Sequence, residues 1–212
     1  MSTSFVEWHN ETMAKRVVKS FENNGFQAYY SRTRNEAIEK VLELVPKDAK
    51  VGTGGSMTIR ELELPRILAE RGNVVVRHDA SGQKSSFEMR RETLLSDVFL
   101  ASANAVTLDG KLVNIDGGGN RVAAMSFGPK KTIIVVGINK VTRDLDSAIW
   151  RVKNVAAPMN VRRLNMKAPC ASDGFCSECT SEDRICKAIL ILEKMPSYTD
   201  YHIVVVGERL GF

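Results

Sequence analysis

Long apolar runs and dense blocks of basic residues are both missing from this 212-residue sequence. The longest apolar stretches, such as residues 133–137 and 203–206, have the length of strands and are too short to cross a bilayer. The first residues lack the basic and then apolar regions of a signal peptide, which favours a cytoplasmic protein with reduced thiols. The net charge of +5 arises among 25 interspersed acidic residues, without the basic runs that are typical of nucleic-acid surfaces. We therefore expect partners other than membranes or nucleic acids.

Several nucleotide-binding and catalytic signatures are absent too. The sequence has no Walker A loop, no complete dinucleotide fingerprint and no Gly-x-Ser-x-Gly elbow. The chain therefore carries no recognisable fingerprint for flavin or nicotinamide chemistry.

Cysteine is scarce, but its four copies are concentrated in one segment, Pro169-Cys170-x5-Cys176-x2-Cys179-x6-Cys186. Four thiols this close together, with a Cys-x-x-Cys pair at the centre, suit an iron–sulfur cluster or a tetrahedral metal ion. Reduced thiols argue against a pair of disulfides, while redox-switching thiols and inert cysteines remain alternatives. We expect a [4Fe–4S] cluster, or else zinc, on four ligands: Cys170, Cys176, Cys179 and Cys186. Basic residues near these thiols would offset the negative charge of such a centre, or would simply be a solvated surface: Arg162, Arg163, Lys167, Arg184 and Lys187.

Strand and helix signals alternate along the chain, which predicts a single α/β domain over residues 1–212 with a mostly parallel sheet flanked by helices. Leu108-Asp109-Gly110-Lys111 adds an antiparallel hairpin. Residues 144–155 and 158–164 are expected to be helical. The cysteine-rich segment, residues 166–187, is interpreted as an insertion whose second half continues into a helix over residues 182–194.

The first glycine-rich loop, Gly52-Thr-Gly-Gly-Ser56, is placed where a predicted strand turns into a helix. Glycines at such a turn let backbone N–H groups approach an anion, although they also serve in tight turns that bind nothing. The candidate ligand-binding residues of this loop are Gly52, Gly54, Gly55 and Ser56.

The second glycine-rich loop, Asp116-Gly117-Gly118-Gly119-Asn120-Arg121, has three consecutive glycines, which a purely structural loop would seldom need. Arg121 could clamp a carboxylate or phosphate bidentately. In the structural alternative, Asn120 caps the following helix and Arg121 pairs with Asp116. Lys140, after a predicted strand, could reach the same site, though a solvated lysine is the simpler expectation.

These segments together resemble the LUD-domain family of lactate-utilisation proteins, the group that includes the small C component of the L-lactate oxidation system. The matching stretches cover the chain from about residue 10 to its end: Val51-Gly-Thr-Gly-Gly-Ser-Met-Thr58, Ala103-Asn104-Ala-Val-Thr-Leu-Asp-Gly-Lys-Leu-Val-Asn-Ile-Asp116 with the residues through Val122, Val136-Gly-Ile-Asn-Lys140, Ala148-Ile-Trp-Arg151 and Gly207-Glu-Arg-Leu-Gly-Phe212. The cysteine segment is similar to that of a subgroup of these proteins.

The resemblance implies a fold like that of ribose-5-phosphate isomerase, glucosamine-phosphate deaminase (NagB) and CoA transferases, with both glycine loops and Asn104 bordering one cleft. It implies a component of a system that oxidises lactate or another 2-hydroxyacid, binding a small carboxylate or phosphorylated metabolite, with partner subunits or a homodimer as the assembly. One alternative is a free-standing isomerase or acyl/CoA-transferase-like enzyme that uses Asp116, Asn120 and Arg121 in catalysis. Another is a metal-sensing regulatory protein without catalysis.

Overall fold

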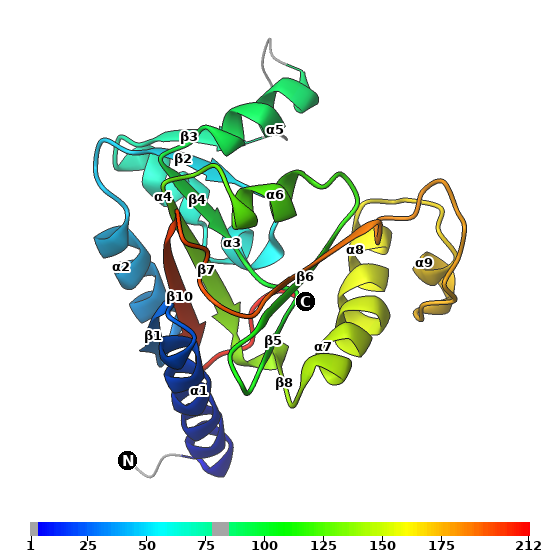
Figure 1. Ribbon diagram of the computed structural model, residues 1–212, viewed down its shortest axis with the longest axis horizontal. Helices are drawn as coiled ribbons and strands as arrows, with labels where there is room; N and C mark the ends of the chain where they lie inside the picture. The colour runs from blue at the N-terminus through cyan, green and yellow to red at the C-terminus, as the bar shows by residue number, and fades with distance from the viewer. Residues whose placement is uncertain (1–3, 78–84) are drawn as a thin grey trace.

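The computed structural model describes residues 4–77 and 85–212 and shows an α/β architecture with two sheets (Figure 1). The larger sheet has the strand order β1-β10-β7-β4-β2-β3, and each neighbouring pair is parallel. Its strands are β1 (Gln27–Ser31), β10 (Asp200–Val206), β7 (Lys131–Gly137), β4 (Val98–Ala101), β2 (Lys50–Thr53) and β3 (Val74–Arg77). The predicted parallel sheet is confirmed.

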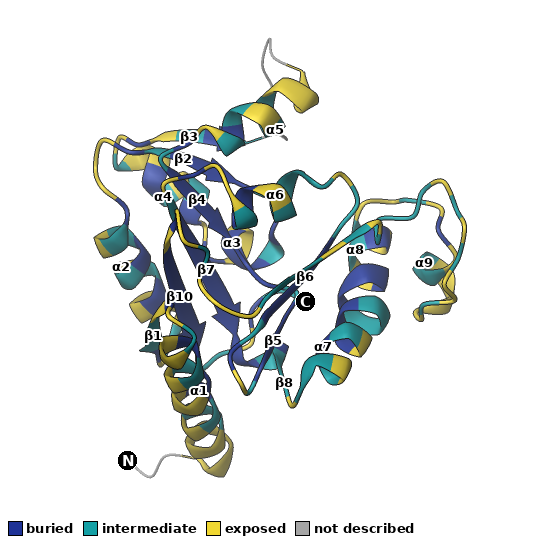
Figure 2. Ribbon diagram, in the orientation of Figure 1, coloured by how far each residue is buried: buried dark blue, intermediate teal, exposed yellow. Residues whose placement is uncertain are grey.

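Helices cover both faces of this sheet, and the alternation of side chains along each strand divides the core into two layers. The helices are α1 (Phe5–Asn23), α2 (Arg34–Leu44), α3 (Met57–Glu61), α4 (Leu64–Glu70), α5 (Ser86–Leu94) and α6 (Asn120–Ser126). Ile134 and Val136 pack with α1 on one face, whereas Ile133 and Val135 pack with α2, α3 and α4 on the other. Successive side chains of a strand point to opposite faces, so a strand covered on both sides is apolar throughout. Figure 2 shows these strands as the buried centre of the molecule.

The smaller sheet has four strands in the order β8-β5-β6-β9. They are β8 (Val141–Thr142), β5 (Ala105–Thr107), β6 (Leu112–Asp116) and β9 (Ala188–Leu192). Strands β5 and β6 form the predicted antiparallel hairpin at Asp109-Gly110. Gly110 has a φ of +82°, and a Cβ there would lie 2.6 Å from the backbone carbon of Ser20 in α1. The turn therefore needs glycine both for its backbone conformation and for its close contact with α1.

The prediction of a helix over residues 182–194 is wrong. Residues 188–192 form strand β9, which pairs antiparallel with β6 from Leu112↔Leu192 to Asp116↔Ala188. Ser181 lies in a turn, in which its side chain and carbonyl oxygen accept the N–H groups of Asp183 and Arg184. A short apolar run can form either element, and here the free edge of β6 decides in favour of a strand.

The two helical segments predicted on either side of residue 156 form one continuous rod. It comprises α7 (Leu145–Arg151), a π-helical turn η2 (Val152–Ala156) and α8 (Ala157–Arg163). Pro158 lies in the first turn of α8. In a regular α-helix the proline ring would clash with the carbonyl of the residue four positions earlier, and the wider π turn relieves that crowding.

Two short helices complete the fold, η1 (Ile138–Lys140) after β7 and α9 (Cys170–Asp173) in the cysteine-rich segment. In Figure 1 the rod, α9 and the loops that follow lie at the right, beside the smaller sheet. Among residues 4–77 and 85–212, no helix is long and apolar enough to cross a membrane.

Candidate functional site

A cavity of about 380 Å³ lies where the parallel strands β2, β4 and β7 end. We call it the cationic cleft; its lining includes Ser56, Asn104, Asp116, Arg121, Lys140 and Arg163. Ser56 follows β2, Asn104 follows β4 and Lys140 follows β7, so the ends of three neighbouring strands bring these side chains together. Ligands of open α/β sheets bind at this edge.

The lining of the cationic cleft carries far more positive than negative charge. Among the described residues, the acidic side chains in its lining are those of Asp116 and Glu182. The cations in the lining are Arg90, Arg121, Lys140, Arg163, Arg184 and Lys187. Such a concave surface attracts anions and holds them through charge-assisted hydrogen bonds.

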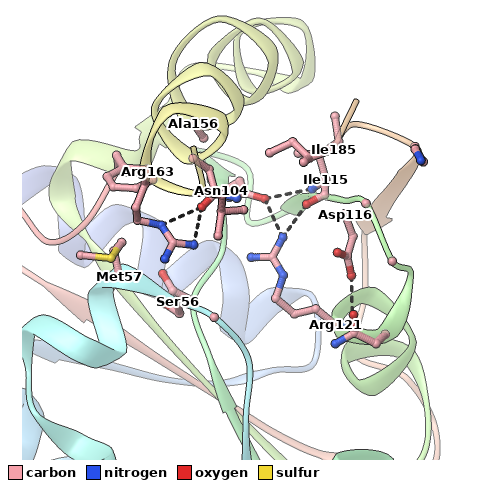
Figure 3. Close-up of a pocket in the computed structure, with 18 of the residues that line it drawn as sticks. Ser56, Met57, Asn104, Ile115, Asp116, Arg121, Ala156, Arg163 and Ile185 are labelled. Carbon is pink, nitrogen blue, oxygen red and sulfur yellow. Dashed lines mark hydrogen bonds between the residues drawn. The ribbon is translucent and has the colours of Figure 1, made fainter. Parts of the chain in front are cut away.

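Arg121 projects from α6 into the cleft and is fixed by the neighbouring strand (Figure 3). Its Nη2 donates to the carbonyl oxygen of Ile115 and, at 3.4 Å, to Oδ1 of Asn104. The same Asn104 oxygen accepts the backbone N–H of Ile115 at 2.9 Å. Burial lowers the pKa of the Arg121 guanidinium and Asp116 opposes that shift, but an arginine remains charged at neutral pH. The guanidinium is thus a positioned cation with N–H groups left for a ligand.

Asp116 anchors the start of α6. Its Oδ2 accepts the backbone N–H groups of Arg121 at 2.8 Å and Val122 at 3.2 Å. Asn120 is the first residue of α6, preceded by Gly119 with a φ of +77°. The structural alternative therefore holds only in part. Arg121 does bond to Asp116, through its backbone N–H, but Asp116 rather than Asn120 caps the helix. Both Asp116 and Asn120 line the cleft.

The three glycines of the second loop meet different surroundings. A Cβ on Gly117 would lie 3.2 Å from both the Cα and the carbonyl oxygen of Ile185, so the backbone just before the last cysteine, Cys186, packs directly on this loop. A Cβ on Gly118 would meet only the side-chain oxygen of Asn120 at 3.0 Å, with Arg90 farther off at 3.9 Å. Gly119 has open space but a left-handed backbone. Gly117 and Gly118 border the cleft.

The first glycine loop divides between packing and the cleft. A Cβ on Gly52 would lie 2.7 Å from Thr93 Cγ2, so Gly52 allows β2 to pack on α5 rather than facing a ligand. Gly54 lies against Arg121, and a Cβ on Gly54 would be 3.0 Å from the arginine Cδ. Gly55 and Ser56 line the cleft, and Ser56 also caps α3 by accepting the N–H of Ile59.

Lys140 is buried in the wall of the cleft, with 3% of its surface exposed. Its Nζ donates to Thr58 Oγ1 at 2.7 Å and to Ser102 Oγ at 2.9 Å. Burial, then the charges of Arg151 and Arg121, lowers the pKa of Lys140 to about 7, and Glu61 acts in the opposite direction. The expectation of a solvated lysine is wrong. A lysine with this pKa can act as a base or a nucleophile near neutral pH.

The four cysteines gather around a second, smaller cavity of about 10 Å³, which we call the cysteine pocket. All four thiols are free and half-buried: Cys170, Cys176, Cys179 and Cys186. Burial, followed by the proximity of the other three cysteines, raises the pKa of the Cys170 thiol. Thiols from positions 16 residues apart thus share one site, as the sequence spacing suggested.

Hydrogen bonds around the cysteine pocket reach both sulfur atoms and the carbonyl oxygens of Cys179 and Cys186. Arg184 Nε donates to Cys186 Sγ at 3.1 Å, and the backbone N–H of Glu178 donates to Cys176 Sγ at 3.4 Å. Charge from Cys186 raises the pKa of the Arg184 guanidinium. Hydrogen bonds of this kind stabilise thiolates and tune metal or cluster sites.

The donor set of the cysteine pocket fits a thiolate-bound metal centre, while its dimensions do not match one. No group of three or more Cys, His, Asp or Glu side chains in the described part of the chain is spaced to hold a metal ion. The cavity has room for about one water-sized particle. The loop would have to close around an ion or open around a larger cluster, which is common where metal binding and local folding are coupled.

Comparisons with known proteins agree with this architecture. The family model of the LUD domain matches residues 14–206. That range contains the residues that line both cavities except Phe212, at the end of the chain. The chain belongs to the LUD domain family. A crystal structure of a DUF162 family protein from Deinococcus radiodurans is similar over 93% of this chain and 97% of that one, with a TM-score of 0.56 and 12% identity. That likeness supports the fold, and no curated protein matches the sequence.

The rod of this LUD domain lies between the two cavities. Ala156, Asn160 and Arg163 line the cationic cleft, whereas Lys153, Ala157 and Val161 line the cysteine pocket. Residues three or four apart share a face of a helix, so two adjacent stripes of one rod serve the two cavities. Arg184 and Ile185 line both cavities as well. The sulfur site and the cleft are therefore neighbours in space.

Sequence reasoning missed several cleft residues of the LUD domain. The sequence indicated Arg163 only as a charge near the cysteines, but it enters the cleft on a different side from Arg121 and bonds to Asn160 Oδ1 at 2.6 and 3.0 Å (Figure 3). Arg90 comes from α5, and Phe212 comes from the end of the chain. The spacing of residues 156, 160 and 163 places them on one face of a helix, and this is the sequence signal that could have grouped them.

Proposed function

We propose that this LUD-domain protein binds a small carboxylate or phosphorylated metabolite in its cationic cleft as a component of a system that oxidises lactate or a related 2-hydroxyacid. The observation that carries the proposal is the excess of basic side chains, six against the two acidic ones of Asp116 and Glu182, around a cavity at the ends of parallel strands. The volume of about 380 Å³ is in the range of small-molecule sites.

The residues of the cleft divide the task of holding such an anion. Arg121 and Arg163 present guanidinium groups from α6 and α8, and planar N–H pairs suit a carboxylate or phosphate. Asn104 and Asp116 hold Arg121 and its helix in place. Asp116 has its Oδ2 occupied by backbone N–H groups, which favours positioning over acid–base catalysis by this residue.

The cysteine pocket forms the second part of the proposal. Cys170, Cys176, Cys179 and Cys186 would hold a [4Fe–4S] cluster, or alternatively zinc, with Arg184 offsetting part of the charge. A cluster would supply one-electron transfer, whereas zinc would supply a structural link. The neighbouring positions of pocket and cleft support a role in the same reaction system, which would include partner subunits for the remaining redox chemistry.

Metal analysis of protein purified without oxygen tests the second part. Iron and acid-labile sulfide with visible absorption would support the cluster. Zinc without a chromophore would overturn the electron-transfer version and leave the structural one. Protein that binds neither iron nor zinc when both are supplied would overturn the metal site altogether.

Anion binding tests the first part. Lactate, acetate, inorganic phosphate and ribose 5-phosphate should each be titrated while the melting temperature is followed, because a ligand of the folded state raises it. Arg121→Ala should weaken binding of the preferred anion by about ten- to a hundredfold, the equivalent of about 1.5–3 kcal/mol for hydrogen bonds to a charged group.

Arg143→Ala is the matched control, since Arg143 is an exposed arginine that pairs with Asp144 outside the cleft. This control should bind anions as the wild type does. If no anion at millimolar concentration shifts the melting temperature of the wild type, or if both arginine variants lose binding equally, the cleft does not have the proposed function.

A further inference from the structure

Lys140 differs from the other cations of the cleft because it is buried among hydroxyl groups. Its hydrogen-bond partners are Thr58 and Ser102, and among the described residues no carboxylate forms an ion pair with it. By contrast, Lys187 is exposed and its Nζ lies 3.4 Å from the carbonyl oxygen of Glu182. An exposed lysine or arginine would supply positive charge without the free-energy cost of burying it. The burial of Lys140 therefore calls for a separate explanation.

The hydrogen bonds around Lys140 leave one direction of its nitrogen open. Ser102 Oγ donates to the carbonyl of Ala103 at 3.2 Å, and Thr58 Oγ1 donates to the carbonyl of Leu210 at 3.3 Å. Because both hydroxyl protons are used in this way, both oxygens accept from Lys140. An unprotonated amine has two N–H groups and one lone pair, so it can satisfy both acceptors and keep the lone pair for a ligand.

The end of the chain keeps this space narrow. Gly211 has a φ of +57°, and a Cβ there would lie 2.6 Å from Thr58 Oγ1 and 3.4 Å from Lys140 Nζ. Its N–H donates to Glu61 and its carbonyl accepts from Asn139, which fixes the segment over the lysine. The amine is thus held in place and shielded from bulk water, as a nucleophilic lysine requires.

We propose that Lys140 forms a reversible imine with a carbonyl compound that also carries a carboxylate or phosphate group. The inference rests on the proposed anion-binding function of the cleft and names the class of ligand for it. The anionic group would bind to the guanidinium side of the cleft, near Arg121, and the carbonyl carbon would face the lysine nitrogen.

The step balances without any oxidant or reductant. The lone pair of Nζ attacks the carbonyl carbon, a C–N bond forms, and the carbonyl oxygen leaves as water with the two protons that the amine carried. Ser102 and Thr58 accept hydrogen bonds from those protons before the step and can relay them. Water reverses the reaction, so the imine accumulates only while the carbonyl compound is present.

Lys140 is protonated less than ordinary lysines at neutral pH, which favours it as the nucleophile in this reaction. Burial and the charges of Arg151 and Arg121, opposed by Glu61, lower the pKa of Lys140 to about 7. About half of its amines are then unprotonated at pH 7, against roughly one in three thousand for an exposed lysine.

Reductive trapping tests the proposal on the full chain. The protein is incubated with pyruvate or with glyceraldehyde 3-phosphate, and sodium cyanoborohydride then delivers hydride to any imine and makes the bond permanent. Peptide mapping by mass spectrometry locates the added mass. We expect it at Lys140 in the wild type and in Lys130→Arg, which replaces an exposed lysine that pairs with Asp97 outside the cleft. We expect no label at position 140 in Lys140→Arg.

Each outcome decides the matter, because the labelled residue is identified in wild-type protein and does not depend on the folding of a variant. Label spread over exposed lysines such as Lys187, with no excess at Lys140, would overturn the imine. If pyruvate or the phosphate raises the melting temperature but leaves Lys140 unlabelled, the imine is overturned while the anion-binding cleft stands. If neither compound binds or labels, the imine is overturned, and the titrations with lactate, acetate and the phosphates decide separately whether the cleft binds anions.

Discussion

The cationic cleft and the cysteine pocket are neighbours built in opposite ways. The cleft is assembled at the ends of β2, β4 and β7, and its polar groups are fixed by hydrogen bonds such as those from Arg121 to Ile115 and Asn104. The cysteine pocket is assembled mainly by a loop; between α8 and β9, a stretch described throughout, α9 of four residues is its one regular element. Figure 2 shows the sheet buried and the region around α9 largely half-buried or exposed.

This difference indicates what each site needs in order to form. A cleft on a rigid sheet is preorganised before a ligand arrives, which reduces the cost of binding. A loop site with four thiols and a cavity of about 10 Å³ gains its final geometry from whatever it binds. We therefore expect the cleft to survive loss of the sulfur site, and the sulfur site to respond strongly to small changes in its own loop.

The largest expected effect comes from replacing a thiol. Cys176→Ser should abolish stoichiometric metal or cluster binding, because a serine hydroxyl is not deprotonated at neutral pH as a ligating thiol is. Metal content of protein purified without oxygen measures the effect. Anion binding in the cleft should be retained, as judged by the ligand-induced rise in melting temperature.

Ser177→Ala, in the same turn, is the matched control and should keep its metal. If Cys176→Ser loses anion binding together with metal, the cleft is not preorganised and the comparison between the two sites breaks down. If it keeps its metal, this cysteine is not a ligand.

The location of the cleft could be predicted from the sequence, whereas the burial of individual side chains in it could not. Two glycine loops at strand ends, with Asp116 and Arg121, were enough to place a site at the sheet edge, because strand ends of a parallel sheet converge. The burial of Lys140 could not be predicted, since it results from Thr58, Ser102 and the chain end folding over one side chain. Likewise, residues 188–192 form a strand only because β6 offers them an edge.

An intermediate effect is expected from the charge state of Lys140. The pKa of this lysine falls from 10.5 to about 7 in the folded protein. Between pH 7 and pH 10 the unfolded chain therefore binds more protons than the folded one, and the free energy of unfolding rises with pH by up to roughly 1.4 kcal/mol per unit. Below pH 7 both states are protonated, and the cost of burying the charge is fully present.

Lys140→Met, which is similar in volume and uncharged, removes this dependence. Denaturant titrations from pH 6 to pH 10 should show wild type gaining stability relative to the variant, with Arg121, Arg151 and Glu61 unchanged around the site. Parallel stability curves for the two proteins would show that Lys140 stays charged throughout, and the cleft would then be more open to water than its geometry indicates.

The smallest expected effect concerns the contact that joins the two sites. Gly117→Ala would place a Cβ 3.2 Å from the Cα and the carbonyl oxygen of Ile185, and backbone atoms cannot move aside as a flexible side chain can. We expect a loss of about 1–3 kcal/mol in the free energy of unfolding, as for other overpacked positions. Metal retention should also weaken, because Ile185 precedes the proposed ligand Cys186 and lines the cysteine pocket.

Gly118→Ala is the matched control because the nearest atom that a Cβ there would meet is the end of the Asn120 side chain, at 3.0 Å. Both substitutions reduce backbone freedom in the unfolded chain in the same way, so their difference isolates the contact with Ile185. If Gly117→Ala lowers metal retention and Gly118→Ala does not, strain at one edge of the cleft is transmitted to the sulfur site. Equal behaviour of the two variants would mean that the backbone around Ile185 yields freely, and that the two sites, though adjacent, are mechanically independent.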